Sequence, residues 1–78
     1  MGQAAMSLQA EGDGIRVTLK TLTPSFKRYE MRVDGGEWKA SENDFVWPVH
    51  PGSNRLEARA VNQFGVVGPV STAEINVK

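Results

Sequence analysis

The sequence contains no cysteine among its 78 residues, and this absence removes several classes of chemistry. Disulfide bonds, thiolate metal sites and cysteine nucleophiles all need the thiol group. The nine basic and nine acidic side chains cancel, so no excess of positive charge attracts nucleic acid or anionic lipid. We therefore expect no nucleic-acid partner.

Long apolar runs are also missing. No stretch approaches the roughly 18 apolar residues of a membrane-spanning helix, so we expect no membrane insertion. The first six residues carry no basic group and no apolar run, and they do not resemble a signal peptide. We interpret residues 1–6 as a flexible N-terminal segment and residues 7–78 as a single domain, excised from a longer protein.

Apolar residues recur at every second position instead of at the helical spacing. Ile15, Val17 and Leu19 alternate with polar side chains, and Leu56 and Ala58 do so later in the chain. Such alternation is typical of strands with one face in a core and the other in water. The predicted strands are residues 7–10, 15–21, 28–33, 37–40, 44–49, 55–61 and 72–77. Seven short strands between regular turns predict an all-β, antiparallel sandwich of two sheets.

Local signals add detail to this sandwich. The run Asp34-Gly35-Gly36 predicts a hairpin turn, because glycine accepts the positive φ that such turns require. Pro48 cannot donate a ladder hydrogen bond, so the fifth strand is expected either at a sheet edge or with a bulge at Pro48. The expected core consists of Ile15, Val17, Leu19, Tyr29, Met31, Val33, Trp38, Phe45, Trp47, Leu56, Ala58, Ala60 and Ile75.

The third and sixth predicted strands carry charged side chains on one face. These are Arg28, Glu30 and Arg32 on the third strand and Arg55, Glu57 and Arg59 on the sixth. If the two strands pair, opposite charges form a cross-strand ladder that is weak per pair. The competing interpretation is a patch that binds a polyanion.

Residues 56–71 carry a recognisable pattern, Leu56-x-Ala58-x-Ala60-x-Asn62-x-x-Gly65, then Gly68-Pro69 and Ser71. This pattern resembles the sixth strand and following turn of fibronectin type III domains, and Tyr29-x-Met31-x-Val33 is similar to their third strand. Two positions depart from the family: Leu19 stands where a Trp is usual, and Asn54 stands at the corner tyrosine. We expect the Asn54 side chain to cap this corner through backbone hydrogen bonds.

The resemblance implies a fibronectin type III-like or immunoglobulin-like accessory domain of a bacterial exported protein. Such modules are often appended to secreted glycan-degrading enzymes, and they also occur in periplasmic sensor proteins. It therefore implies a non-catalytic structural, spacer or domain-docking role in an extracellular or periplasmic setting. The implied partners are neighbouring domains of the parent chain, and the isolated domain is expected to be a monomer.

Catalytic and metal-binding groups are sparse. His50 is the single histidine, in a predicted turn, and nearby Ser41 and Ser53 lie on exposed segments without a supporting framework for a triad. Asp13 and Asp34 are turn residues with no run of oxygen ligands for calcium. We expect no enzymatic activity, no cofactor and no metal.

The aromatic side chains leave two further functions open. We expect Tyr29, Trp38 and Trp47 in the core and Phe64 as a lid over one end. Trp38, Trp47 and Phe64 suggest a carbohydrate-binding module, which requires at least one exposed aromatic ring, and exposure of both Trp38 and Phe64 would indicate a ligand or partner patch. The other function is protein–protein recognition through a sheet edge or loops, against which the short edge strands and Pro48 argue. The candidate contact residues are therefore Trp38, Phe64, Arg28, Arg32 and Arg59.

Overall fold

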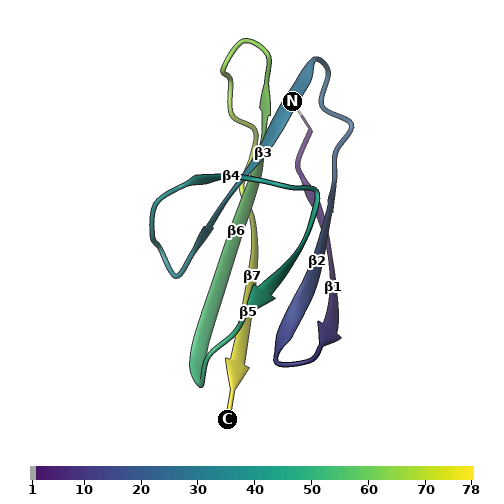
Figure 1. The fold of residues 1–78 in the computed structure, drawn as a ribbon. Coiled ribbons are helices and arrows are strands. Elements are labelled where there is room, and N and C mark those ends of the chain that lie inside the picture. The colour runs from purple at the N-terminus through teal and green to yellow at the C-terminus, as the bar shows by residue number, and fades with distance from the viewer. Residues whose placement is uncertain (1) are drawn as a thin grey trace.

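The computed structural model describes residues 2–78 and contains two antiparallel β-sheets that form a sandwich (Figure 1). The strands are β1 Ala5–Glu11, β2 Gly14–Lys20, β3 Phe26–Val33, β4 Lys39–Ser41, β5 Asp44–Pro48, β6 Gly52–Asn62 and β7 Ser71–Val77. One sheet has the order β1-β2-β5 and the other has the order β4-β3-β6-β7. The prediction of a seven-stranded, immunoglobulin-like sandwich is confirmed, with β5 at an edge as Pro48 indicated. No helix in the described residues is long and apolar enough to cross a membrane.

A two-residue turn joins β1 to β2, and Glu11 pairs with Gly14 across it. Gly12, the first turn residue, has a φ of 57°, a conformation that glycine adopts without steric cost. This turn fixes the register so that Leu8 lies opposite Val17. Because side chains alternate along a strand, the apolar positions of both strands then share the inner face.

The core lies between the sheets and contains Trp47, whose side chain is fully buried. The other buried members of this cluster are Ala4, Val17, Leu19, Tyr29, Leu56, Ala58, Ala60 and Ala73. Partly buried side chains pack around it, namely Met6, Ile15, Met31, Val33, Phe45, Val49 and Ile75. Every residue that the sequence placed in the core belongs to one of these sets except Trp38.

The first strand starts earlier than the sequence predicts. β1 begins at Ala5, two residues before the predicted start at residue 7, and Ala4 is fully buried. The Ser71 hydroxyl donates a hydrogen bond to the Ala4 carbonyl, which ties this segment to the start of β7. The domain therefore includes part of the segment 1–6 that was interpreted as flexible; Met1 lies outside the described residues, and the mobility of the segment stays a prediction.

Asn54 caps the corner between β5 and β6, as expected. Its side chain is 1% exposed, its Oδ1 accepts a hydrogen bond from His50 N at 2.9 Å, and its Nδ2 donates to the His50 carbonyl at 2.7 Å. The same Nδ2 lies 3.4 Å from the carbonyl of Ile75 on β7. One buried amide thus replaces the corner tyrosine by satisfying the backbone groups of the turn.

The molecule is elongated, with principal extents of 41 × 21 × 15 Å. Gly2 lies at the end where β2 leads into β3, and its carbonyl accepts a hydrogen bond from Thr23 Oγ1 at 3.1 Å. β7 runs to the other end, where Val77 pairs with Gly52. The described chain therefore enters at one end of the long axis and leaves at the opposite end (Figure 1).

Candidate ligand and partner surfaces

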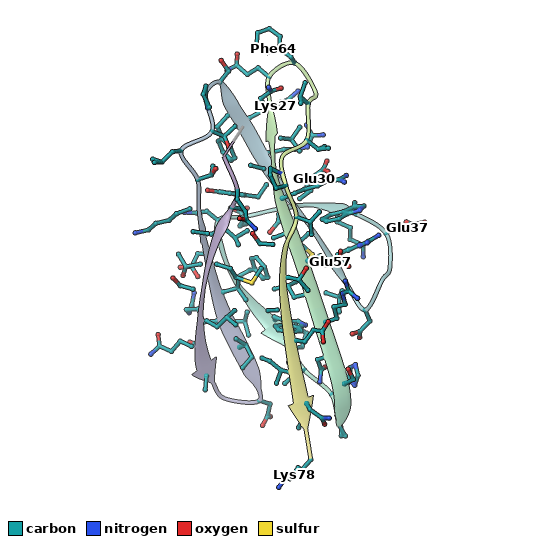
Figure 2. The ribbon with its side chains drawn as sticks, turned by 180° about the vertical axis from the view of Figure 1, so that it is seen from behind. Lys27, Glu30, Glu37, Glu57, Phe64 and Lys78 are labelled. Carbon is teal, nitrogen blue, oxygen red and sulfur yellow. The ribbon has the colours of Figure 1, made fainter. Side chains whose placement is uncertain are left out.

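Three candidate residues, Arg28, Arg32 and Arg59, lie on the outer face of the four-stranded sheet. β3 and β6 pair so that Glu30 lies opposite Arg59 and Arg32 lies opposite Glu57, the two carboxylates labelled in Figure 2. Arg32 donates two hydrogen bonds to Glu57 at 2.9 and 3.0 Å, and Arg59 donates two to Glu30 at 2.9 and 2.8 Å. Arg28 donates to the other oxygen of Glu30 at 3.1 and 2.9 Å. The two strands do pair, and the charged ladder expected from such pairing is present.

The two carboxylates of the ladder are largely shielded from water, because the Glu57 side chain is 6% exposed and that of Glu30 is 14% exposed. Hydrogen bonds from Arg59 hold the pKa of Glu30 below its ordinary value, and hydrogen bonds from Arg32 do the same for the pKa of Glu57. Desolvation opposes both shifts and is outweighed. The carboxylates therefore stay ionised in mild acid and keep their guanidinium partners.

Trp38 lies over this ladder. The Cζ atoms of Arg59 and Arg32 are 3.9 and 4.8 Å from the centroid of its ring, within the range of cation–π attraction. The prediction that Trp38 belongs to the core is wrong. β4 pairs Lys39 with Met31, so the preceding residue, Trp38, comes alongside Arg32 on the outer face of the sheet.

This arrangement favours a self-contained charged face over a polyanion site. Each of the three arginines already donates at least two hydrogen bonds to a carboxylate, and two of them also contact an aromatic ring. An incoming phosphate or sulfate would have to displace Glu57 from a bidentate contact with Arg32, or Glu30 from the guanidinium groups of Arg28 and Arg59. Such charge-assisted contacts are among the stronger hydrogen bonds in proteins. The ladder and Trp38 together form a small polar layer outside the sandwich.

Phe64 projects from the loop between β6 and β7 and is 80% exposed. Asn62 closes this loop, since its Oδ1 accepts hydrogen bonds from Phe64 N at 2.9 Å and from Val66 N at 3.0 Å, and Gly65 has a φ of 77°. The prediction that Phe64 packs as a lid is wrong, because the loop is closed by its own Asn62 and leaves the ring at the tip of the molecule (Figure 2).

The end that carries Phe64 has further exposed apolar side chains, and we name it the apolar end. They are Leu22, Phe26, Phe64, Val66, Val67 and Val70. They come from the β2–β3 loop with the first residue of β3, and from the β6–β7 loop. These two segments lie side by side, because Gln63 N donates to the Ser25 carbonyl at 2.8 Å. Residues 21–26 and 60–73 include no acidic or basic side chain. Exposed apolar groups gathered in this way are typical of contact surfaces.

The candidate residues do not meet in one site. Trp38 stacks on Arg59, which lies three residues before β6 ends at Asn62, whereas Phe64 lies beyond that end in the loop. The structure therefore offers two separate surfaces, the ladder face and the apolar end. Among the apolar residues of the end, Leu22 is 96% exposed and was missed by sequence reasoning. Its signal was a single leucine between two threonines, followed by Pro24, which cannot donate a ladder hydrogen bond.

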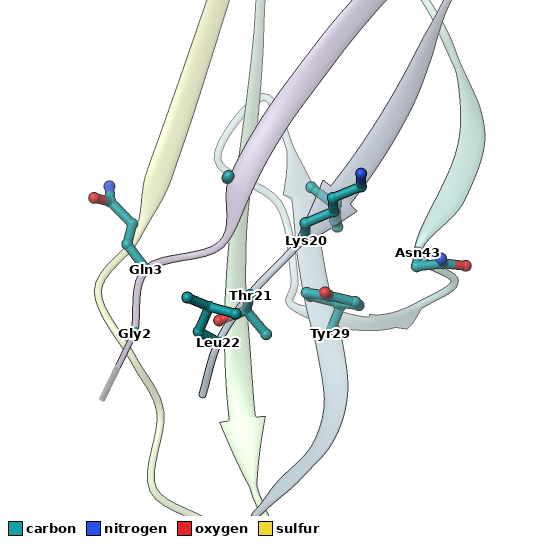
Figure 3. A pocket seen from close by; sticks show the side chains of 9 residues that line it. Gly2, Gln3, Lys20, Thr21, Leu22, Tyr29 and Asn43 are labelled. Atoms are coloured by element: carbon teal, nitrogen blue, oxygen red, sulfur yellow. The ribbon is translucent and has the colours of Figure 1, made fainter. Parts of the chain in front are cut away.

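An open depression of about 730 Å³ lies beside the apolar end (Figure 3). Leu19, Leu22 and Tyr29 contribute apolar surface, and Lys20 and Asn43 add polar groups. Burial raises the pKa of Tyr29, so its hydroxyl stays protonated. With one cationic side chain and no carboxylate among its lining residues, the depression provides no acid–base pair for catalysis.

His50 and Asp34 form a clasp between the β3–β4 and β5–β6 loops. His50 Nδ1 lies 2.9 Å from the Pro51 carbonyl, and Nε2 lies 2.9 Å from Asp34 Oδ2. The Pro51 carbonyl and the Asp34 carboxylate raise the pKa of His50, and the His50 ring lowers the pKa of Asp34. Both ring nitrogens face oxygen acceptors, so neither is placed to take a proton from a serine. Within residues 2–78, no three side chains of His, Asp or Glu come together as metal ligands.

No protein-family model matches this sequence, and no curated protein matches it. Among solved structures, the fold is similar to the crystal structure of the PKD1 domain of Vibrio anguillarum Epp. The TM-score is 0.67, the match covers 96% of this chain and 93% of that one, and the sequence identity is 14%. A likeness at this identity shows a shared immunoglobulin-like sandwich and leaves function to be argued from the surfaces.

Proposed function

We propose that this chain is a non-catalytic accessory module of a larger, exported bacterial protein, in which it holds neighbouring domains apart as a rigid spacer. The observation that carries the proposal is the position of the chain ends. Gly2 and Val77 lie at opposite ends of a body whose longest extent is 41 Å. A module threaded in this way adds its full length between the segments on either side.

The apolar end supports a docking contact with the domain on its N-terminal side. The N-terminal segment lies beside it, since Gln3 Nε2 donates to the carbonyl of Val70 at 3.4 Å. The short extents of 21 and 15 Å make this end too small for the roughly 1,200 Å² of a stable intermolecular interface. A covalently joined neighbour has a high effective concentration, so a small apolar contact is enough to fix its orientation.

The accessory and exported character rests on the fibronectin type III-like resemblance, with glycan-degrading enzymes as the expected kind of parent. The closed ladder face and the occupied nitrogens of His50 agree with a role that involves no catalysis. The inner core supplies the rigidity that a spacer needs, because its side chains are held by close packing.

A distance measurement between two spin labels tests the spacer role. Because the chain has no cysteine, Leu22→Cys and Asn76→Cys place one label on an exposed residue near each end. We expect one narrow distance distribution that polysaccharides do not change, with the denatured chain as the broad reference. A distribution as broad as that of the denatured chain would show that the module cannot set a spacing.

A carbohydrate-binding module is the second candidate, and Trp38 is the observation that favours it. Two guanidinium groups lie against its ring, and a fixed, partly exposed indole is suited to stacking on a sugar ring. Titration of tryptophan fluorescence with neutral and acidic polysaccharides separates the candidates. A shift that disappears in Trp38→Phe and persists in Phe64→Leu would favour sugar binding at the ladder face over the spacer role.

A further inference from the structure

The two open sheets have four edge strands, and they differ in how well they are protected. β4 has three residues and starts with Lys39, while β5 ends in Pro48, which has no N–H; both features discourage further strand pairing. β7 carries Glu74 at its centre. β1 has seven residues, six of them exposed, no proline, and a single charge at its end, Glu11.

Backbone groups of β1 are available on its open side. Residues of an edge strand direct their amides alternately towards the neighbour and away from it. The Glu11–Gly14 pair closes a two-residue hairpin and is therefore hydrogen-bonded, so Met6, Leu8 and Ala10 direct their amides away from β2. Ala4 follows the same alternation, and its outward carbonyl indeed accepts a hydrogen bond from Ser71.

The middle of β1 also leaves apolar surface uncovered. Leu8 lies opposite Val17, which is fully buried, and so it belongs to the inner face of its sheet. Nevertheless, Leu8 is 45% exposed, and the hydrogen bonds to residues 70 and 71 come from Gln3 and Ala4, which precede β1. A further strand beside β1 would satisfy its outward amides and cover this leucine at the same time.

We propose that β1 pairs with β1 of a second copy of this chain, antiparallel about a two-fold axis at Leu8. The two three-stranded sheets then form one continuous sheet. In this register Leu8 faces the partner's Leu8, Met6 faces the partner's Ala10, Ser7 faces the partner's Gln9, and Ala5 faces the partner's Glu11. Apolar side chains meet on the inner face. On the outer face Ser7 meets Gln9 and Ala5 meets Glu11, and no two charges of the same sign are opposed.

An antiparallel two-fold pairing of this kind is unfavourable at the other three edge strands. A two-fold axis at the centre of β7 places Glu74 opposite the partner's Glu74, which is a direct repulsion. At the centre of β5 it places Pro48 opposite the partner's Asp44, where the missing N–H interrupts the ladder. β4 has too few residues for more than one or two pairs. Self-complementarity therefore singles out β1.

The length of the strand sets the strength of this contact. Seven residues span about 24 Å, and a contact one strand wide stays well below the roughly 1,200 Å² of stable interfaces. We expect a dissociation constant of about 0.1 to 1 mM, so the domain is a monomer when dilute and pairs when it is concentrated on a surface or in an array.

Sedimentation velocity and NMR line widths, from about 10 µM to about 1 mM protein, test the proposal. The key variant is Leu8→Lys, which opposes two like charges at the axis. The matched control is Val46→Lys, because Val46 is the central residue of β5 and is 46% exposed, against 45% for Leu8. We expect wild type and Val46→Lys to associate alike and Leu8→Lys to remain monomeric. A monomeric wild type, or association unchanged in Leu8→Lys, overturns the proposal.

Disulfide cross-linking tests the register. Because the sequence has no native cysteine, only the introduced thiols can react. In Leu8→Cys the two thiols face each other across the axis, whereas in Ser7→Cys each thiol faces the partner's Gln9. We expect disulfide-linked dimers of Leu8→Cys to form about tenfold faster than those of Ser7→Cys, because disulfide geometry tolerates little displacement. Equal rates would overturn this register. A negative result leaves the spacer role intact, since that role depends on the chain ends and not on β1.

Discussion

The two tryptophans of this chain lie in opposite kinds of surroundings. Trp47 lies between the sheets, fully buried among apolar side chains, and its Nε1 finds no hydrogen-bond partner among residues 2–78. Trp38 lies outside the sandwich on the guanidinium groups of Arg32 and Arg59, which are in turn held by buried carboxylates. The inner ring is held by shape and by exclusion of water, and the outer ring is held by charge.

This difference teaches where a small domain gains its stability. The inner cluster acts through apolar burial, which does not depend on pH or moderate salt. The outer cluster acts through ion pairs and cation–π contacts, which weaken in salt and depend on the ionisation of Glu30 and Glu57. Replacing Trp47 and Trp38 one at a time measures what each cluster contributes to the free energy of unfolding. Changing the pH then tests how far the contribution of the outer cluster depends on its ionised carboxylates.

Trp47→Ala should have the largest effect. Truncation of a buried aromatic ring costs about 3 to 5 kcal/mol, a large part of the roughly 5 to 10 kcal/mol expected for such a domain. Urea unfolding followed by circular dichroism measures the loss. Trp47→Phe is the control, and it should cost less because it also removes the unpaired indole N–H. A urea midpoint of Trp47→Ala close to that of wild type would contradict the position of this ring.

Trp38→Ala should have an intermediate effect, about 1 to 2 kcal/mol, from the loss of two cation–π contacts and of cover over the ladder. The same urea unfolding measures it at low and at high salt. The difference between wild type and variant should shrink in high salt, whereas the corresponding difference for Trp47→Ala should not. A salt-independent loss would mean that Trp38 acts through apolar burial alone.

Acid should selectively weaken the outer cluster. The folded-state pKa values of Glu30 and Glu57 lie below their ordinary value of 4.5, so their contribution is complete above pH 4.5 and is lost as the pH falls through the lower folded values. Stability measured between neutral pH and acid should therefore fall less in Glu57→Gln than in wild type. Parallel curves for both proteins would show that Glu57 is not linked to folding.

The His50–Asp34 clasp should contribute least to stability. Its contribution should be lost as the pH rises, whereas that of the outer cluster is lost as the pH falls. The folded-state pKa of His50 lies above 6.5, so its contribution is present below pH 6.5 and is lost as the pH rises through the folded value. An NMR titration of the single histidine measures this pKa directly. In Asp34→Asn it should fall towards 6.5, while in Glu37→Gln, a change in the same loop, it should stay where it is.

The period-two pattern was enough to predict the sandwich because nearly every strand carries several alternating positions. Trp47 was placed correctly, since it shares its face with Phe45 in a strand whose register is fixed by the long strand β2. Trp38 was misplaced because it follows two glycines and precedes a strand of three residues. In so short a strand, a shift of one residue moves every side chain to the other face of the sheet. The length of the preceding loop decides which register forms.

The surfaces were less accessible from sequence than the core. The ladder was predictable because its charges alternate in step with the strands that carry them. Phe64 and Leu22 lie in turns, where no alternation of apolar residues indicates whether a side chain points inward. The direction of Phe64 depends on the hydrogen bonds of Asn62, which only the structure reveals. The early start of β1 was hidden because Ala4 and Ala5 are small and carry no strong strand preference.

The placement of the two chain ends also determines how the molecule responds to force. A pull applied through a preceding and a following segment acts along β1 and β7, parallel to both strands. The hydrogen bonds that hold these strands to β2 and β6 lie across the direction of that pull. Each ladder therefore resists such a pull by sliding as a whole instead of opening one hydrogen bond at a time.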